Sequence, residues 1–250
     1  MNVHSAFRIP HSVLVVMARS PDHDPERIKT RLAPIVPHAS DRRSLYAAFL
    51  ADTLANARVG AAAAGASIRV AFTPDGSDAA FARFGVTAGD LMAQRGETLG
   101  DRERSIFDDL FESGAVYVVI VGSDLPTLPP ERIEEAFAAL ERDRPALVLG
   151  PSGDGGYYLI GLNARARTAR AVERTGVPDL FSQVRWSTPH TLSDTLTAAE
   201  RYGLAVRLLL EWHDVDDPED LARLQTELAD PGTAARAPAS ADVLRRWSVI

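Results

Sequence analysis

Acidic side chains follow two apolar runs of the chain. Asp124 comes shortly after the run Ala115–Val121, and Asp214 and Asp216 follow the run Leu204–Leu210. One residue separates Asp214 from Asp216, so both carboxylates point to the same side of an extended segment. Carboxylate oxygens are the ligands that Mg²⁺ and Mn²⁺ prefer. We therefore predict that Asp124, Asp214 and Asp216 form a metal site for Mg²⁺ (or Mn²⁺).

A glycine-rich stretch at residues 150–156 supplies a further acid. Gly153, Gly155 and Gly156 surround Asp154. Glycines adopt positive φ angles readily and let a ligand approach the backbone closely. The spacing is neither that of a Rossmann motif nor that of a P-loop. Asp-Gly also marks hairpin turns, so a plain turn between two strands is the alternative.

Basic residues follow the first apolar run, Val13–Ala18. Lys29 and Arg31 lie in the polar segment after it. Arginine binds phosphate as a planar fork and lysine as a point charge. The alternative is a solvated loop, because lysine and arginine are mostly exposed. A metal on one side of the site and these cations on the other would together bind a polyphosphate, which is the ligand that we predict.

Some of these acids also have a structural explanation. Ser123 or Asp124 could cap the turn that Pro126 holds open. Asp217 precedes Pro218 and first-turn acids, a pattern typical of a helix N-cap. The N-cap explanation accounts for Asp217 but gives no structural role to Asp214 and Asp216.

The elements that would position these residues alternate between strands and helices, which predicts an α/β fold with a mostly parallel sheet covered on both faces. Ligands of such sheets bind beyond the carboxyl ends of the strands, where these acids and bases lie. The predicted strands are Val13–Ala18, Ser67–Phe72, Leu91–Gln94, Ala115–Val121, Ala146–Leu149, Tyr157–Gly161 and Leu204–Leu210. The predicted helices are Ala39–Ala57, Ala79–Phe84, Arg102–Glu112, Pro129–Arg142, Arg165–Arg174, Pro189–Tyr202 and Pro218–Leu228.

Composition limits the possible functions. The 250 residues are 46% hydrophobic and 24% charged, which is ordinary for a globular protein. We expect one domain over residues 1–230 and an Ala- and Pro-rich tail at 231–250, with a short terminal helix in the tail as the alternative. The net charge of −7 argues against nucleic-acid binding, and the run Val13–Ala18 is too short for a membrane span. The absence of cysteine excludes thiolate chemistry and fits a cytoplasmic protein.

These motifs resemble the GT-A-type nucleotide-diphospho-sugar transferase superfamily and, within it, the bacterial DUF2064-like glycosyltransferase group, which includes arsenosugar-biosynthesis and radical-SAM-associated transferases. The resemblance extends from Val13 to Leu224. It implies one Rossmann-like GT-A sandwich of three layers (α/β/α). It rests on the motifs KTRL (29–32), LGDR (99–102), GSDLPTL (122–128), GPSGDGGYYLIGL (150–162), FSQVRWST (181–188) and DVDDPEDL (214–221).

The resemblance also implies roles for individual residues. Asp124 would hold a divalent ion that bridges the nucleotide phosphates, and Lys29 of the KTRL motif would reach those phosphates. The loop 19–28 departs from the small, glycine-containing loop that is usual in this group. Contacts to nucleotide or acceptor are expected from Arg102, Ser123, Pro126, Gly153, Asp154, Gly155, Gly156, Tyr157, Trp186 and Ser187.

Members of the superfamily differ in the group that they transfer. The Lys29–Arg31 pair and the single aspartate of the SDLP motif resemble the nucleotidyl-transferring branch, such as the guanylyltransferases of coenzyme F420 and molybdenum-cofactor synthesis. We therefore predict transfer of an NMP from an NTP to a small phosphorylated or acidic acceptor, with release of pyrophosphate. The alternatives are a glycosyltransferase that uses an NDP-sugar and a non-catalytic nucleotide-binding protein. The sequence does not predict an oligomeric state.

Overall fold

The computed structural model describes residues 11–142, 145–168 and 177–247. In these ranges seven strands form one sheet in the order β3-β2-β1-β4-β6-β5-β7. β6 runs antiparallel to its neighbours β4 and β5, and the other pairings are parallel, which confirms a mostly parallel sheet. The strands are β1 (Ser12–Arg19), β2 (Ser67–Thr73), β3 (Leu91–Ala93), β4 (Tyr117–Val121), β5 (Pro145–Pro151), β6 (Tyr157–Asn163) and β7 (Ala205–Leu208).

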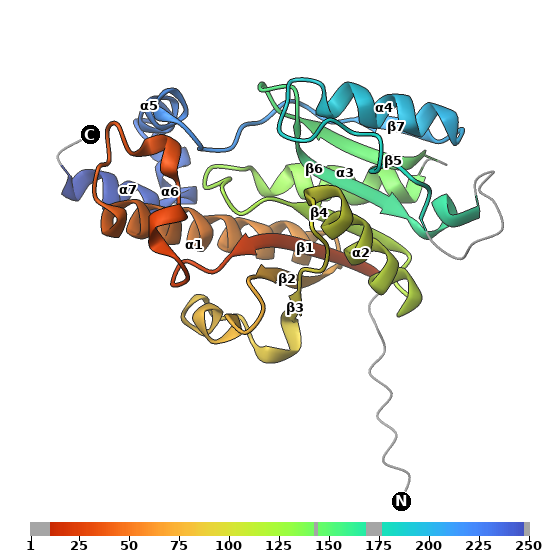
Figure 1. Ribbon diagram of the computed structural model, residues 1–250, viewed down its shortest axis with the longest axis horizontal. Helices are drawn as coiled ribbons and strands as arrows, with labels where there is room; N and C mark the ends of the chain where they lie inside the picture. The colour runs from red at the N-terminus through yellow and green to blue at the C-terminus, as the bar shows by residue number, and fades with distance from the viewer. Residues whose placement is uncertain (1–10, 143–144, 169–176, 248–250) are drawn as a thin grey trace, which may run out of the picture.

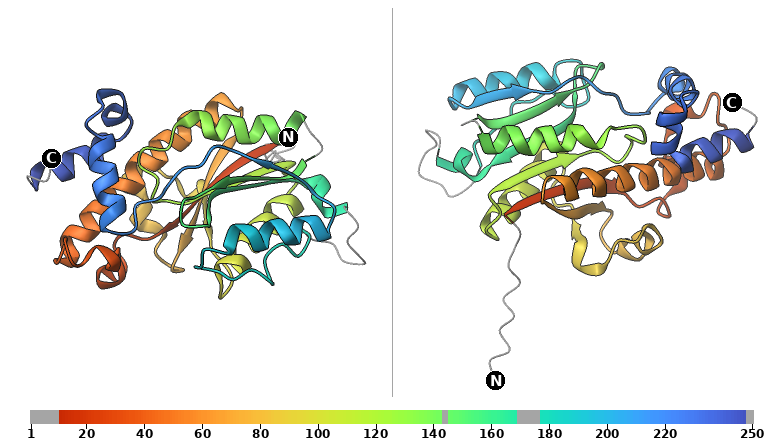
Figure 2. Two further views of the ribbon diagram at one scale, coloured as in Figure 1. Left: turned by 90° about the horizontal axis from the view of Figure 1, so that it is seen from above. Right: turned by 180° about the vertical axis from the view of Figure 1, so that it is seen from behind.

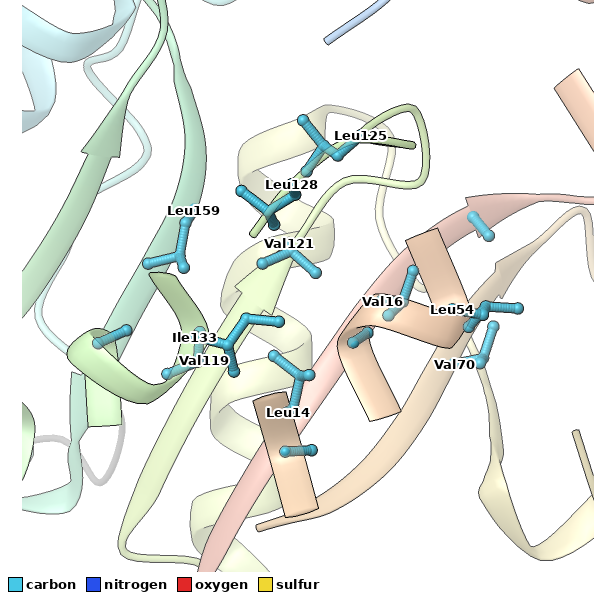
Figure 3. Packing of buried hydrophobic residues seen from close by; sticks show 14 of the residues in the cluster. Leu14, Val16, Leu54, Val70, Val119, Val121, Leu125, Leu128, Ile133 and Leu159 are labelled. Atoms are coloured by element: carbon cyan, nitrogen blue, oxygen red, sulfur yellow. The ribbon is translucent and has the colours of Figure 1, made fainter. Parts of the chain in front are cut away.

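Helices cover both faces of the sheet and make the three-layer α/β/α sandwich (Figures 1 and 2). On one face, α1 (Ala39–Ala63) and α3 (Pro130–Arg142) pack against apolar side chains of β1 and β4. Figure 3 shows part of this layer, in which Leu54 and Ile133 lie near strand residues such as Val16 and Val119. On the other face lie α2 (Leu99–Glu112) and α4 (Thr191–Arg201).

A third apolar cluster joins the C-terminal helices to the N-terminal half of α1 (Figure 1). These helices are α5 (Pro218–Glu227), α6 (Pro231–Arg236) and α7 (Pro238–Arg246). The tail expected at 231–250 is therefore, over its described part, two helices packed on the domain. The buried carboxylate of Asp52 in α1 anchors α7, since it accepts hydrogen bonds from the backbone N–H of Ser240 at 2.8 Å and from its Oγ at 2.6 Å.

Three features of the sheet place the site. β1 and β4 are adjacent and parallel, so the loops after them lie side by side at one edge. β6 runs the opposite way, which brings its first residue, Tyr157, to the same edge. The turn between β5 and β6, at residues 152–156, joins them there. No helix in the described ranges is both long enough and apolar enough to cross a bilayer. Most of the helix predicted at Arg165–Arg174 lies outside the described residues, and Ala164–Thr168 forms a 3₁₀ helix.

Candidate functional site

The centre of the site is a buried lysine held between two aspartates. Lys29 Nζ lies 2.7 Å from Asp124 Oδ2 and 2.6 Å from Asp216 Oδ1, and donates a hydrogen bond to the carbonyl of Val215 at 2.7 Å. The Lys29 side chain is only 6% exposed, and it is the single lysine of the sequence. Burial lowers its pKa, but the charges of Asp124 and Asp216 outweigh burial, so the net pKa lies above the ordinary lysine value. The ammonium therefore stays charged across the physiological range.

Local backbone structure directs Lys29 inward. Lys29 has a left-handed conformation, with φ of 48°, and precedes a short 3₁₀ turn at Thr30–Leu32. The neighbouring side chains of Ile28 and Leu32 are buried, which anchors the loop on both sides of the lysine. A left-handed non-glycine residue costs free energy, so the surrounding contacts must hold this conformation in place.

Three polar side chains of α1 hold the loop that carries Asp124. The hydroxyl of Tyr46 lies 3.1 Å from Ser123 Oγ. Thr53 Oγ1 donates to the carbonyl of Ser123 at 3.1 Å, and Asn56 Nδ2 donates to the carbonyl of Pro126 at 2.9 Å. Ser123 and Pro126 thus fix the position of Asp124. Asp124 is not a plain turn cap, because its carboxylate pairs with the lysine.

The segment that carries Asp214 and Asp216 reaches the same point through the backbone. Val215 N–H donates to the carbonyl of Asp124 at 3.1 Å. Burial raises the pKa of Asp216, but the ion pair with Lys29 lowers it by more. The net pKa of Asp216 is therefore below the ordinary aspartate value. Burial raises the pKa of Asp214 to about 6, and the charges of Asp216 and Asp124 add to this rise. Three acids from two loops therefore lie close enough to repel one another.

The three acids have the donor chemistry of a divalent-ion site but not its geometry. Their carboxylate oxygens are of the hard type that Mg²⁺ and Mn²⁺ bind. The pKa of Asp214 is raised partly by the negative charges of Asp124 and Asp216, which a bound cation would offset. The donor chemistry fits. However, no group of three or more His, Asp or Glu residues in the described ranges is arranged around a common point as metal ligands. Lys29 instead occupies the space between Asp124 and Asp216.

A basic cavity of about 290 Å³ opens beside Lys29. Four cations line it, namely Arg19, Arg27, Lys29 and Arg31, against the two carboxylates of Asp124 and Asp216. Ser123 and Tyr46 complete its polar wall. We call this the first cavity. Its size and its charge suit a phosphate-bearing ligand.

A second cavity of about 420 Å³ lies on the β6 side of the same acids. Arg31 and Asp216 line both cavities, so the two adjoin. The second cavity brings together several residues predicted from the sequence: Asp154, Gly156, Tyr157, Trp186, Ser187 and Asp214. A third cavity of about 390 Å³, lined by Gly153, Asp154 and His213 among others, also meets Arg31 and Asp216. Arg31 is exposed and lies 3.7 Å from Asp216 Oδ2, at the junction of the three.

Comparison with protein-family models gives one match, over residues 53–188, to DUF2064, a family described as an uncharacterized protein conserved in bacteria. The chain belongs to this family. A search of curated proteins gave no match.

Among solved structures, the chain is similar to a protein of Desulfovibrio desulfuricans G20 provisionally named as a nucleotide-diphospho-sugar transferase. The identity is 28%, the TM-score is 0.80, and 95% of each chain is covered. It also shares the fold of 4-diphosphocytidyl-2C-methyl-D-erythritol synthase from Anaerococcus prevotii DSM 20548, at 10% identity and a TM-score of 0.54, with 88% and 99% of the two chains covered. A third structure is CMP:2-keto-3-deoxy-manno-octonic acid synthetase complexed with CTP, at 14% identity and a TM-score of 0.50, with 87% and 98% covered.

These comparisons confirm the predicted GT-A-like fold and family. The provisional name of the Desulfovibrio desulfuricans protein, which is 28% identical, agrees with the prediction of a transferase. Identities of 10% and 14% establish the fold alone.

The structure places three predicted site residues away from the cavities. Arg102 lines none of the three, and its Nε donates to the carbonyl of Gly96 at 3.1 Å. Pro126 contributes to the site only through the loop that carries Asp124, where its carbonyl accepts a hydrogen bond from Asn56 Nδ2. Gly155, with φ of +85°, packs so tightly that a Cβ there would lie 2.3 Å from the carbonyl oxygen of Pro189. For Gly155 the close approach is made by the chain itself rather than by a ligand.

Two expected structural roles are present alongside the site. Asp154 Oδ1 accepts a hydrogen bond from Gly156 N–H at 2.9 Å, so it shapes the β5–β6 turn as well as lining cavities. Asp217 caps α5, because its carboxylate accepts from the N–H groups of Glu219 and Asp220.

Sequence reasoning missed Glu103, which lines the second cavity and is buried. A signal for it existed. Glu103, Ile106, Phe107 and Leu110 have the spacing of the buried face of a helix, and a glutamate is unusual at such a position. Arg19 and Tyr46 of the first cavity were also absent from the predicted site.

Proposed function

We propose that the protein is a nucleotidyltransferase that moves an NMP from an NTP to a small acceptor and releases pyrophosphate. The observation that carries this proposal is the buried Lys29, paired with Asp124 and Asp216 at the boundary between the basic first cavity and the acidic second cavity. The first cavity would bind the donor phosphates. The second would bind the acceptor.

The cations of the first cavity would bind and neutralise the donor phosphates. Lys29 is fixed by its two carboxylates, whereas Arg31 is exposed and makes only a longer ion pair with Asp216, so it could turn toward a ligand. Phosphoryl-group chemistry depends mainly on positioning and charge neutralisation, so no covalent nucleophile is required. Lys29 and Arg31 would therefore stabilise the negative charge that develops on the departing pyrophosphate.

A divalent ion would complete this charge balance. Asp124, together with Asp214 or Asp216, would hold Mg²⁺ (or Mn²⁺). When bound, the ion would supply Lewis-acid polarisation of the phosphate oxygens. The SDLP loop would keep Asp124 in place for this role, because Thr53 and Asn56 bond its backbone carbonyls and Tyr46 contacts the Ser123 hydroxyl.

Glycosyl transfer from an NDP-sugar is a second candidate. The provisional name of the Desulfovibrio desulfuricans relative favours it. The same cavities would serve, with an NDP as the leaving group in place of pyrophosphate.

Product analysis separates these candidates. The protein would be incubated with Mg²⁺ and each of the four NTPs, or with UDP-, GDP- and CDP-sugars, in the presence of a pool of small acceptors. Pyrophosphate release indicates nucleotidyl transfer and NDP release indicates glycosyl transfer, whereas nucleotide binding without either product indicates a non-catalytic protein.

Asp124→Asn serves as the test variant and Asp242→Asn, an exposed site on α7 that lines none of the three cavities, as its matched control. We expect Asp124→Asn to lose about 10²–10³-fold in turnover and Asp242→Asn to lose none. Normal turnover in Asp124→Asn would contradict the assigned role of that carboxylate.

A further inference from the structure

Glu103 is a buried carboxyl group in the wall of the second cavity. It lies on α2 and is 4% exposed, yet it lines the cavity. The hydroxyl of Tyr157, at the start of β6, donates a hydrogen bond to Glu103 Oε2 at 2.7 Å. Among the described residues, no ion pair is formed by Glu103. A carboxyl group buried without a cation costs folding free energy, so its presence beside a cavity points to a ligand.

Aromatic rings hold the cavity open next to Glu103. The rings of Tyr157 and Trp186 meet edge to face, with centroids 6.4 Å apart. Trp186 stacks on Phe181, and its Nε1 donates to the carbonyl of Phe181 at 3.3 Å. Gly100, on the first turn of α2, leaves room for the Trp186 ring. Flat aromatic faces beside the hydroxyls of Ser152, Thr188 and Thr191 suit a molecule with both C–H and O–H groups.

The charges of the second cavity select against an anionic acceptor. Its wall contains four carboxyl groups, from Glu103, Asp154, Asp214 and Asp216, and one guanidinium, from Arg31. Glu103 carries no charge below its raised pKa, so a phosphorylated acceptor would meet the like charges of the aspartates in this cavity. The first cavity has the opposite balance, with four cations against two carboxylates.

We propose that the second cavity binds an uncharged, polyhydroxylated acceptor and that Glu103 is the general base that takes the proton from its attacking hydroxyl. This inference rests on the proposed function and replaces the phosphorylated or acidic acceptor expected from the sequence. The acceptor oxygen forms a bond to the α-phosphorus of the NTP. The bond between that phosphorus and the bridging oxygen breaks, and pyrophosphate leaves with the electron pair. The acceptor proton passes to Glu103.

The protonation equilibrium of Glu103 supports this role. Burial raises its pKa to about 8, and the hydrogen bond from Tyr157 partly offsets the rise. A base works best when its pKa lies near the working pH. Tyr157 positions the carboxyl group and tunes its basicity. The other titratable groups of the same cavity are Arg31, Asp154, Asp214, Asp216 and Tyr158.

The acceptor class is tested with paired probes. The protein, α-labelled NTPs and Mg²⁺ would be incubated with uncharged hexoses and hexitols, and in parallel with the matching hexose 6-phosphates. Calorimetric titration of the same NTPs would measure donor binding. We expect label transfer to the uncharged series and at least tenfold less to the phosphates. Preferential transfer to the phosphates, or donor binding with transfer to neither series, would overturn the acceptor assignment and leave the donor site standing. Absence of donor binding would overturn both proposals.

Glu103→Gln tests the base. We expect kcat to fall by about 10²–10⁴-fold, with loss of the alkaline rise in rate, while the affinity for the NTP stays within about twofold. Glu112→Gln, an exposed site on the same helix, is the control and should behave as wild type. A higher KM for the acceptor, with unchanged kcat and pH profile, would overturn the assignment of Glu103 as the general base. Glu103 would then only bind the acceptor.

The pH profile of Tyr157→Phe distinguishes a base from a residue with a purely structural role, because a structural role of Glu103 would leave the profile unchanged. The ring against Trp186 is kept, and only the hydrogen bond to Glu103 is lost. Since that bond lowers the pKa of Glu103, its loss should shift the rise in rate to higher pH. An unshifted profile would contradict the coupling of the two residues.

Discussion

Lys29 Nζ lies 2.7 Å from Asp124 Oδ2, and the two residues come from loops that follow the adjacent parallel strands β1 and β4. The contact sets the charge of the whole site. A fixed ammonium separates Asp124 from Asp216, and three arginines extend the positive charge into the first cavity. Removing the lysine would leave three mutually repelling carboxylates.

The first prediction concerns this charge. Lys29→Met should reduce turnover by about 10²–10³-fold, because the group proposed to neutralise the donor phosphates is lost. Lys29→Arg keeps the charge and should recover part of that loss. Steady-state rates of pyrophosphate release measure both variants. Equal rates for Lys29→Met and wild type would show that the ammonium has no part in the reaction.

The second prediction uses the fact that Lys29 is the single lysine. An amine-reactive ester at pH 8 should leave Lys29 unmodified in the native protein, because its raised pKa and burial leave little free amine. In urea Lys29 should react. Peptide mass spectrometry measures the modification of Lys29 under both conditions. Rapid native labelling of Lys29 would place its side chain in solvent.

The third prediction concerns stability and pH. The pKa of Glu103 is about 8 in the folded protein, against about 4.3 for an unfolded glutamate. Between these values the folded state holds a proton that the unfolded chain has released, so this group lowers the free energy of unfolding as pH rises. Glu103→Gln should therefore be more stable than wild type at pH 8, by on the order of 2–5 kcal/mol, and nearly equal to it at pH 4.5.

Urea denaturation at the two pH values measures this difference, with Glu112→Gln as the control. A difference that does not change with pH would mean that Glu103 is ionised in the folded protein.

The fourth prediction concerns packing beneath the second cavity. A Cβ at Gly100 would lie 2.5 Å from Trp186 Cζ2, so Gly100→Ala should displace the ring and destabilise the protein by about 1–3 kcal/mol. Gly89→Ala, where the nearest atom lies 3.8 Å away, is the matched control. Thermal unfolding and the tryptophan fluorescence spectrum report the two effects. An unchanged spectrum in Gly100→Ala would contradict the close contact.

The fold was predictable where one local pattern determined the outcome. Continuous apolar runs located β1 and β4, and the rule that ligands lie beyond strand ends placed Asp124 and Lys29 together. The reversed direction of β6 was not specified by its residues, since an apolar strand reads the same in either direction. The short turn at residues 152–156 makes the two strands antiparallel. The sequence left open whether this stretch was a plain turn between strands or a glycine-rich ligand loop.

The rest depended on tertiary contacts. The segment after Asp230 looked like a tail because it is rich in Ala and Pro, yet Pro231 and Pro238 each begin a helix. Its docking requires Asp52, whose partner at Ser240 is far away in sequence. Glu103 was missed for a similar reason, because its significance depends on Tyr157 and a cavity assembled from separate elements.

The most direct test of the central claim is a crystal structure of the protein with a non-hydrolysable NTP analogue and Mn²⁺, using the anomalous signal of the metal. We predict an anomalous peak about 2.2 Å from a carboxylate oxygen of Asp124, with the phosphates in the first cavity in contact with Lys29 and Arg31. A nucleotide bound elsewhere, or Mn²⁺ located away from Asp124, Asp214 and Asp216, would contradict the proposed site.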